Sequence, residues 1–336
     1  MCGIAGIWGL DRSDPVREMM DKMAHRGPDA EGVHVAPSRG ALGRRRLSIM
    51  DPEGGNQPLY NEARSAVQGM DGMFAFAIAD GKDLFLARDP IGIKPLYYGI
   101  RDAGKPRQTL YFAAELKALA GHIESFDQDL VRSAIPCYFC SRLTAEHVKV
   151  ILTGVGADEL FAGYTYYKEM DDAQKLQSEL RRSVATLHNL NLQRVDRLTM
   201  AHGLEGRVPF LDVAMIQAAQ TVPSELKLFR PDNGKPIEKW VLRKACEDLL
   251  PPEIVWRDKE QFDEGSGTVD LLESILHTAT EGLDVGGYAA AYPQDDLRST
   301  EECLYHKMLV ESFTHPVPVL QNVARWSMDQ WAQFPN

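Results

Sequence analysis

The sequence has few cysteines, no long apolar run and no surplus of basic charge. Five cysteines in 336 residues are too few, and odd in number, for a disulfide framework, so we expect a reducing compartment. Nowhere do 18 or more apolar residues follow one another, so the sequence predicts no membrane-spanning helix. A formal net charge of −11 leaves little general attraction for nucleic acid. We therefore expect neither nucleic acid nor a membrane as a partner.

The apolar start of the chain, Met1 to Leu10, could be taken for a signal peptide. No basic region precedes it, charged residues follow at once with Asp11 and Arg12, and no cleavage site of the usual kind comes after. The sequence therefore predicts a cytoplasmic protein.

The sequence pattern differs between the two halves of the chain. Up to residue 118, short apolar stretches alternate with Gly and Pro, which predicts mostly strands and one helix near Pro15–Ala24. Beyond about Asp129 we expect longer amphipathic helices, such as Asp172–Leu190 and Lys235–Leu250, and an apolar strand at Val148–Leu152. At 44% hydrophobic residues the chain can bury a large core. We predict two domains, residues 1–118 and 119–336, the second an α/β layered domain.

Cys2 directly follows the initiator methionine and precedes small residues. Removal of the methionine would leave a cysteine carrying both a thiol and an α-amine. An α-amine titrates near ~7.7–8.0, so part of it is neutral at pH 7 and can take the thiol proton. The alternative is a buried structural cysteine in a first strand, because free cysteines are often buried.

Several further segments follow Cys2 in a fixed order. They are CGIAGIWG (2–9), HRGPD (25–29), RRLSIMD (45–51), NQPLY (56–60), DGMFAFAIAD (71–80) and RDPIGIKPLYY (88–98). In this order residues 1–118 resemble class II glutamine amidotransferases. The resemblance implies an α+β N-terminal-nucleophile fold, a four-layer αββα sandwich, with Cys2 as the nucleophile that forms a thioester with glutamine.

The same resemblance implies a glutamine-binding segment. It consists of Arg46, Leu47, Ser48, Ile49 and Met50. A guanidinium suits the α-carboxylate of glutamine because it offers a planar fork for bidentate pairing. The alternative makes Arg46 a surface charge beside Arg44 and Arg45. His25, Gly27 and Asp29 are interpreted as structural.

The second half contains three longer matches. They are Val148–Glu169, His202–Asp212 and Glu238–Phe262, which resemble the synthetase domain of glutamine-dependent asparagine synthetases. The resemblance implies an α/β nucleotide-binding domain of the PP-loop ATP pyrophosphatase type. Its strand, glycine turn and helix would bring phosphates to a helix N-terminus.

The resemblance also assigns residues of this second site. Thr153, Gly154 and Gly156 would bind ATP, Asp158 would serve Mg²⁺, and Lys259 would be catalytic by balancing phosphate charge. The alternatives are that Asp158 caps its helix and that Lys259 is solvated.

Val155 departs from the family pattern, which places a catalytic glutamate there. Valine can neither accept a proton nor ligate a metal, and β-lactam-forming relatives place a tyrosine at this position. The stretch Asp263–Gly267 also resembles that branch. Both features favour an acceptor carboxylate other than aspartate.

Two family segments are missing. An Asn-Gly-Glu segment is absent between Arg64 and Gln68, together with a later Asp that binds the glutamine amine. Loss of an oxyanion donor typically costs about 2.7–4 kcal/mol. The S-G-G-x-D-S pyrophosphate loop is absent between Gly121 and His122. One hypothesis is that this loop exists in the protein and is missing only from the sequence. A direct Gly121–His122 bond would refute it and would predict a chain without ATP chemistry.

The function that the resemblance favours is glutamine-hydrolysing, ATP-dependent asparagine synthesis. Aspartate, glutamine and ATP would give asparagine, glutamate, AMP and pyrophosphate through an acyl adenylate and transferred ammonia, with ATP and Mg²⁺ as cofactors. The alternatives are a family member that acts on a different carboxylate, in secondary metabolism, and a non-enzymatic scaffold protein. A homodimer is left open.

Overall fold

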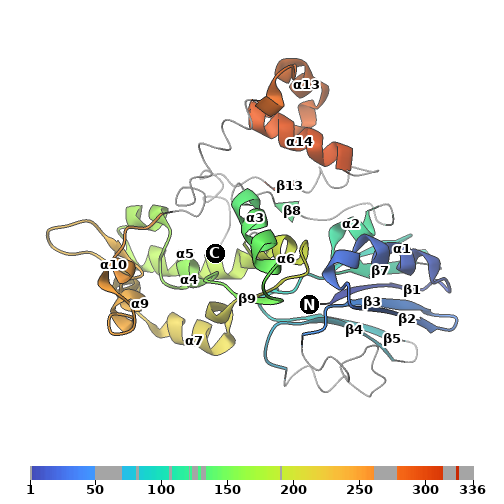
Figure 1. Ribbon diagram of the computed structural model, residues 1–336, viewed down its shortest axis with the longest axis horizontal. Helices are drawn as coiled ribbons and strands as arrows, with labels where there is room; N and C mark the ends of the chain where they lie inside the picture. Colours follow the sequence, from blue (N-terminus) through green and yellow to red (C-terminus); the bar gives the residue numbers. More distant parts are fainter. Residues whose placement is uncertain are drawn as a thin grey trace.

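A computed structural model describes residues 2–49, 70–80, 83–105, 108–120, 122, 128–129, 134–189, 191–260, 278–312 and 323–324. Figure 1 shows the strands of the first half grouped around one sheet and the second half built mostly from helices, with a helix pair near the C-terminus set apart. The chain contains both α and β structure, as the sequence predicts.

The first half is built on a five-stranded antiparallel sheet in the order β2-β3-β1-β7-β6. Its strands are β1 (Gly3–Trp8), β2 (Ala30–Ala36), β3 (Gly40–Arg46), β6 (Tyr97–Arg101) and β7 (Thr109–Ala113). A separate hairpin joins β4 (Ala75–Asp80) to β5 (Asp83–Arg88). Strand β1 is the middle strand of the sheet. Cys2, which directly precedes it, therefore lies where the central strand begins.

Two helices cover one face of this sheet. Helix α1 (Asp14–Lys22) packs its buried Val16, Met19 and Met20 against Ile7 of β1, and α2 (Leu116–Leu119) follows β7. The β4–β5 hairpin lies on the other side in Figure 1. The described residues of the first half thus form a helix layer, the five-stranded sheet and this hairpin, and the αββα sandwich stays a prediction.

In the second half, β9 (Val150–Leu152) pairs in parallel with β10 (Glu205–Arg207). The α-helices in the described part of this half are α3 (Ala134–Ala145), α4 (Ala157–Leu160), α5 (Ala173–Thr186), α6 (Asn191–Met200), α7 (Val213–Thr221), α8 (Ser224–Lys227), α9 (Trp240–Ala245), α10 (Pro252–Val255), α13 (Val285–Ala291) and α14 (Thr300–Ser312). The remaining strands are β8 (Gln128–Asp129) with β13 (Val323–Ala324) and β11 (Leu228–Phe229) with β12 (Ile237–Glu238).

Most of the predicted elements are present. The helix expected near Pro15–Ala24 is α1, and the one expected at Asp172–Leu190 is α5 followed by a 3₁₀ turn at Leu187–Asn189. The helix expected over Lys235–Leu250 is wrong in extent, because only Trp240–Ala245 is α-helical. Lys239 has φ 55°, a left-handed conformation that interrupts helix geometry just before α9.

An apolar cluster joins the two halves. Ile93, from the loop before β6, packs with Leu187, Leu192, Val208 and Leu211 of the second half. Among the described residues, no helix is both long enough and apolar enough to cross a membrane.

The sequence is continuous through the position where the pyrophosphate loop was expected. Gly121 itself lies outside the described residues. The His122 N–H donates to the Leu119 carbonyl at 2.8 Å. The omitted loop stays a hypothesis, and the prediction of a chain without ATP chemistry has to be tested by assay.

Candidate functional site

Cys2 lies directly before the central strand β1, beside the end of β3. In the antiparallel register Gly3 pairs with Arg45, which places Cys2 next to Arg46. The Cys2 thiol is free and partly buried. The structure therefore brings together the predicted nucleophile and the residue predicted to bind the glutamine carboxylate.

The arginines near Cys2 are buried. Arg46 is 5% exposed and Arg44 8% exposed, so the interpretation of Arg46 as a surface charge is wrong. Burial lowers the pKa of the Arg44 guanidinium, an effect opposed by Cys2 and reinforced by Arg46. Positive charge near a thiol favours the thiolate, which is the nucleophilic form of cysteine.

The predicted glutamine-binding segment continues from β3. Leu47 is buried, and the Ser48 N–H donates to Asp29 Oδ2 at 2.6 Å. Asp29, interpreted from the sequence as structural, therefore contacts this segment directly. Met50 lies outside the described residues, as do residues 51–69, where the Asn-Gly-Glu segment was expected.

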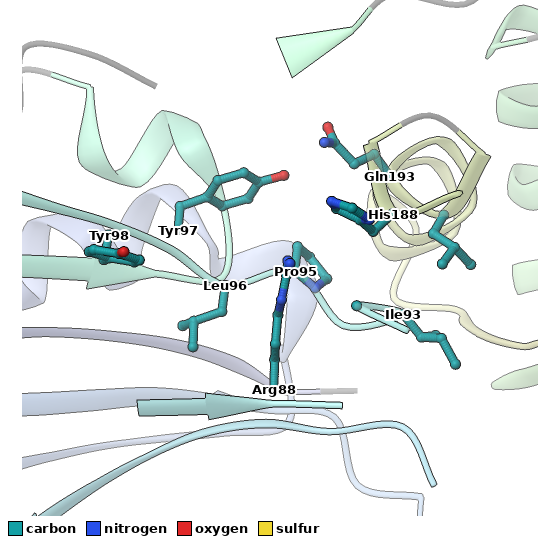
Figure 2. A pocket seen from close by; sticks show the side chains of 10 residues that line it. Arg88, Ile93, Pro95, Leu96, Tyr97, Tyr98, His188 and Gln193 are labelled. Atoms are coloured by element: carbon teal, nitrogen blue, oxygen red, sulfur yellow. The ribbon is translucent and has the colours of Figure 1, made fainter. Parts of the chain in front are cut away.

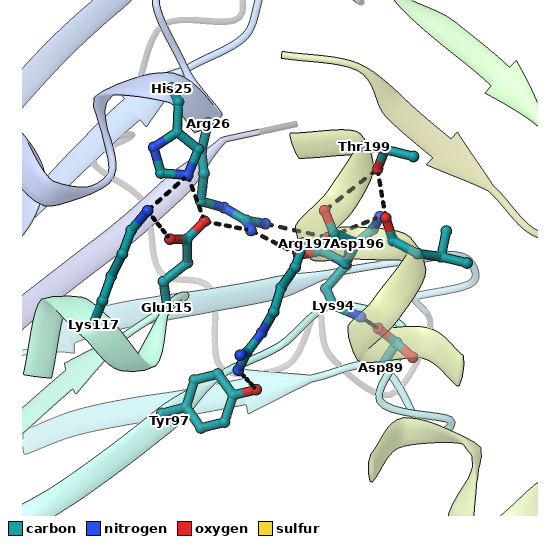
Figure 3. A network of polar contacts seen from close by, with 11 residues as sticks. His25, Arg26, Asp89, Lys94, Tyr97, Glu115, Lys117, Asp196, Arg197 and Thr199 are labelled. Atoms are coloured by element: carbon teal, nitrogen blue, oxygen red, sulfur yellow. Dashed lines mark hydrogen bonds and ion pairs between the residues drawn. The ribbon is translucent and has the colours of Figure 1, made fainter. Parts of the chain in front are cut away.

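A buried ionic network lies where the two halves meet (Figure 3). Arg26 forms a bidentate pair with Asp196 of α6, at 2.7 and 3.2 Å, and also donates to Glu115 at 3.1 Å. His25 Nε2 lies 2.8 Å from Glu115, and Lys94 Nζ lies 3.8 Å from Asp196. Arg26 and Asp196 are 170 positions apart in the sequence, and the sequence analysis did not predict this network.

The predicted nucleotide turn has the expected local form. Strand β9 leads through Thr153–Gly156 into α4, and Gly156 is the N-cap residue with φ 99°. The Thr153 hydroxyl is buried and has no hydrogen-bond partner within the described part of the chain. An unsatisfied buried hydroxyl is consistent with a polar ligand at this turn.

Asp158 lies between two lysines and does not cap the helix. Its carboxylate pairs with Lys239 Nζ at 2.5 Å and with Lys259 Nζ at 3.3 Å. Burial would raise the pKa of Asp158, but the charges of Lys239 and Lys259 lower it. Lys259 is 19% exposed at its side chain, so it is not simply solvated.

Lys239 was missed by the sequence analysis, although it lies inside one of the matching segments. Gly163 makes room for its contact with Asp158. A Cβ at Gly163 would lie 1.9 Å from Asp158 Oδ1 and 2.4 Å from Lys239 Cε. Only glycine fits at this position without displacing the ion pair.

Within the described residues, no three His, Cys, Asp or Glu side chains are grouped as metal ligands would be. Asp158 is thus a single carboxylate that two ammonium groups already neutralise. The Mg²⁺ role of Asp158 stays a prediction.

A pocket of about 320 Å³ opens at the junction of the two halves (Figure 2). Arg88 and Tyr97 line it from the first half, and His188 and Gln193 line it from the second. None of the catalytic or binding residues predicted from the sequence lines this pocket. We therefore assign the candidate sites from the contacts of Cys2 and Asp158.

Comparison with known families gives two matches along the chain. A glutamine amidotransferase domain model matches residues 1–67 and 63–179, and an asparagine synthase model matches residues 168–331. The chain belongs to the glutamine amidotransferase domain family, and its second half is similar to asparagine synthases. The first match is split near residue 65, close to the position where the family's Asn-Gly-Glu segment is missing.

Three relatives show how the chain compares with others in the family. Glutamine-hydrolysing asparagine synthetase 3 of Arabidopsis thaliana is 24% identical over 512 residues, covering 93% of this chain and 87% of the relative. Those of Asparagus officinalis and Saccharomyces cerevisiae are 36% and 32% identical, over 62% and 61% of this chain. These relatives support the predicted class of enzyme, a glutamine-dependent carbon–nitrogen ligase.

The chain is much shorter than these relatives. The chain covers only 35% of the Asparagus protein and 37% of the yeast protein. The Arabidopsis alignment has 512 positions and this chain has 336 residues, so at least 176 positions (512 minus 336) fall opposite gaps. Internal segments of the relative therefore have no counterpart here.

Proposed function

We propose that this protein is a glutamine-hydrolysing, ATP-dependent amide synthetase whose acceptor is aspartate. The observation that supports the proposal most strongly is the position of Cys2 beside the buried Arg46, where the central strand β1 begins. Family membership supports glutamine and aspartate as substrates and ATP as the co-substrate. The role of Mg²⁺ is part of the proposal.

The glutamine half-reaction uses Cys2 and Arg46. The thiolate attacks the side-chain amide carbon of glutamine, ammonia leaves with one added proton, and water hydrolyses the thioester to glutamate. Arg46 pairs with the α-carboxylate and fixes the amide near the sulfur. Without the family's Asn-Gly donors we expect hydrolysis slower than in a complete enzyme by about 10²–10³-fold for one lost donor.

The synthetase half-reaction would use Thr153, Gly154, Gly156, Asp158 and Lys259. ATP, when bound, would supply an activated phosphate that makes the acceptor carboxylate reactive towards ammonia. The Thr153 hydroxyl and the Gly154 and Gly156 backbone would hold phosphate oxygens, and Lys259 would balance their charge. The sequence lacks the family's pyrophosphate loop, so this half depends on fewer contacts than in the relatives.

A second candidate function is amide formation on a different carboxylate. Val155 favours it, because this side chain is partly buried and packs against the apolar cluster that contains Leu192 and Val208. A valine side chain cannot accept a proton from an incoming nitrogen nucleophile.

Three measurements test the proposal. Glutamate release from glutamine, pyrophosphate release with ammonia and a panel of carboxylates, and asparagine formation should all be detectable for the wild type. Cys2→Ala should abolish glutamine use and spare the ammonia-driven reaction. Pyrophosphate release with another carboxylate but not aspartate would identify the second candidate, and Val155→Glu should then shift the preference towards aspartate. Glutamine hydrolysis without pyrophosphate release for any carboxylate would show that the chain has no ATP chemistry.

A further inference from the structure

The turn Ala24–Asp29 packs against the end of β3, where the predicted glutamine-binding segment begins. The Asp29 N–H donates to the Arg46 carbonyl at 3.0 Å, and Pro28 forms a bridge with Arg46. Gly27 fits this contact so closely that a Cβ would lie 2.3 Å from Arg46 N. Movement of the turn would therefore move Arg46.

One end of this turn is joined to the second half at the surface. Asp29 Oδ2 accepts both the Ser48 N–H, at 2.6 Å, and Lys149 Nζ, at 3.1 Å. The Lys149 carbonyl accepts the Glu205 N–H at 2.9 Å, which fixes the lysine backbone just before β9. Through a single carboxylate, a lysine of the second half thus reaches the backbone of Ser48.

The other end of the turn is held in the interior. Arg26 is 1% exposed and pairs with Asp196 of α6, whose side chain is 2% exposed. Bidentate pairs of this kind fix orientation as well as distance. The turn is therefore held from the second half at both ends, by α6 and by the start of β9.

We propose that Asp29 and Lys149 are positioning residues for glutamine, and that they hold Ser48 and Arg46 in the geometry that binds the substrate. The proposal rests on the proposed glutamine hydrolysis. The Asp29 pKa is lowered by the Ser48 hydrogen bond first and by Lys149 second, as expected for a carboxylate held in its charged form. Neither residue touches the reacting atoms, so the effect acts on substrate binding.

The sharpest test uses Lys149→Gln, because Lys149 is 58% exposed and its replacement should leave the fold intact. For an ion pair of this exposure we expect the KM for glutamine to rise about two- to fivefold, with kcat within twofold. Asp29→Asn, which weakens the contact to Ser48 as well, should raise the KM by about tenfold. Lys149→Arg should restore most of the wild-type KM.

Lys105→Gln is a matched control, since Lys105 is also exposed and pairs with an aspartate, Asp102, within one turn of the first half. Its KM should equal that of the wild type. An unchanged KM in Lys149→Gln, a loss confined to kcat, or no rescue by Lys149→Arg would each overturn the proposal.

A second readout separates this proposal from the proposed function. Glutamine should protect Cys2 from alkylation by iodoacetamide, and half-protection should need about two- to fivefold more glutamine in Lys149→Gln. A wild type that neither hydrolyses glutamine nor is protected by it would refute the proposed function. A wild type that does both, with Lys149→Gln indistinguishable from it, would refute only the positioning role.

Discussion

Glu115 is the acidic centre of the buried network, and its replacement by glutamine gives a pH-dependent prediction. The carboxylate accepts from Arg26 at 3.1 Å and lies 2.8 Å from His25 Nε2 and 3.1 Å from Lys117 Nζ. Burial alone would raise its pKa. The hydrogen bond from His25 and the charge of Arg26 outweigh burial and lower the pKa from 4.5 to about 2.

The sign and size of the effect follow from these two pKa values. Because the folded-state pKa is lower than the unfolded one, the stabilisation is fully present above pH 4.5 and is lost as the pH falls towards 2. A difference of about 2.5 pKa units corresponds to about 3 kcal/mol in total. Of this, about 1.4 kcal/mol should be lost between about pH 6 and pH 3.5.

Urea unfolding at these two pH values measures the effect. The free energy of unfolding of the wild type should fall by about 1.4 kcal/mol more than that of Glu115→Gln, which cannot titrate at this position. Glu18→Gln is the control, because Glu18 is 59% exposed and pairs with Lys22 at the surface. If the free energies of unfolding of the wild type and Glu115→Gln differ by the same amount at both pH values, this carboxylate is not a charged, buried partner of Arg26.

Three further substitutions test the second half. Lys227 is fully buried with no hydrogen-bond partner for Nζ in the described part of the chain, and burial lowers its pKa from 10.5 to about 8. Lys227→Met should therefore raise the free energy of urea unfolding at pH 7 by up to about 3 kcal/mol, and the gain should shrink as the pH rises from 8 to 10.5. Gly163→Ala should lower stability by about 1–3 kcal/mol because its Cβ would displace the Asp158–Lys239 pair. Gly154→Ala, which meets nothing within 4 Å, should cost under about 0.5 kcal/mol in the same assay.

Local features of the fold were predictable from local patterns. The helix α1 and the order of strand, glycine turn and helix around Gly156 follow from periodicity and turn residues that lie within a few positions of one another. The approach of Lys259 to Asp158, 101 residues away, followed only from resemblance to a family. Composition and periodicity carry no information about that contact.

The junction network could not be predicted for a physical reason. Arg26 and Asp196 lie in segments whose local patterns specify only a turn and an amphipathic helix, and their pairing depends on how two halves dock. The sequence nevertheless contained a signal. An arginine in the turn before β2 and an aspartate on the buried side of α6 are charged residues at apolar positions, which are stable only if paired.

The same docking bears on the internal segments that this chain lacks relative to the Arabidopsis protein. The contacts that hold the two halves together include the Arg26–Asp196 pair, the Asp29–Lys149 pair and the cluster around Ile93. The absent pyrophosphate loop would belong to the nucleotide site, so its absence removes ligands for phosphate and leaves the junction intact. We therefore expect loss of ATP chemistry, if the assays find it, to leave glutamine binding and its dependence on Lys149 unchanged.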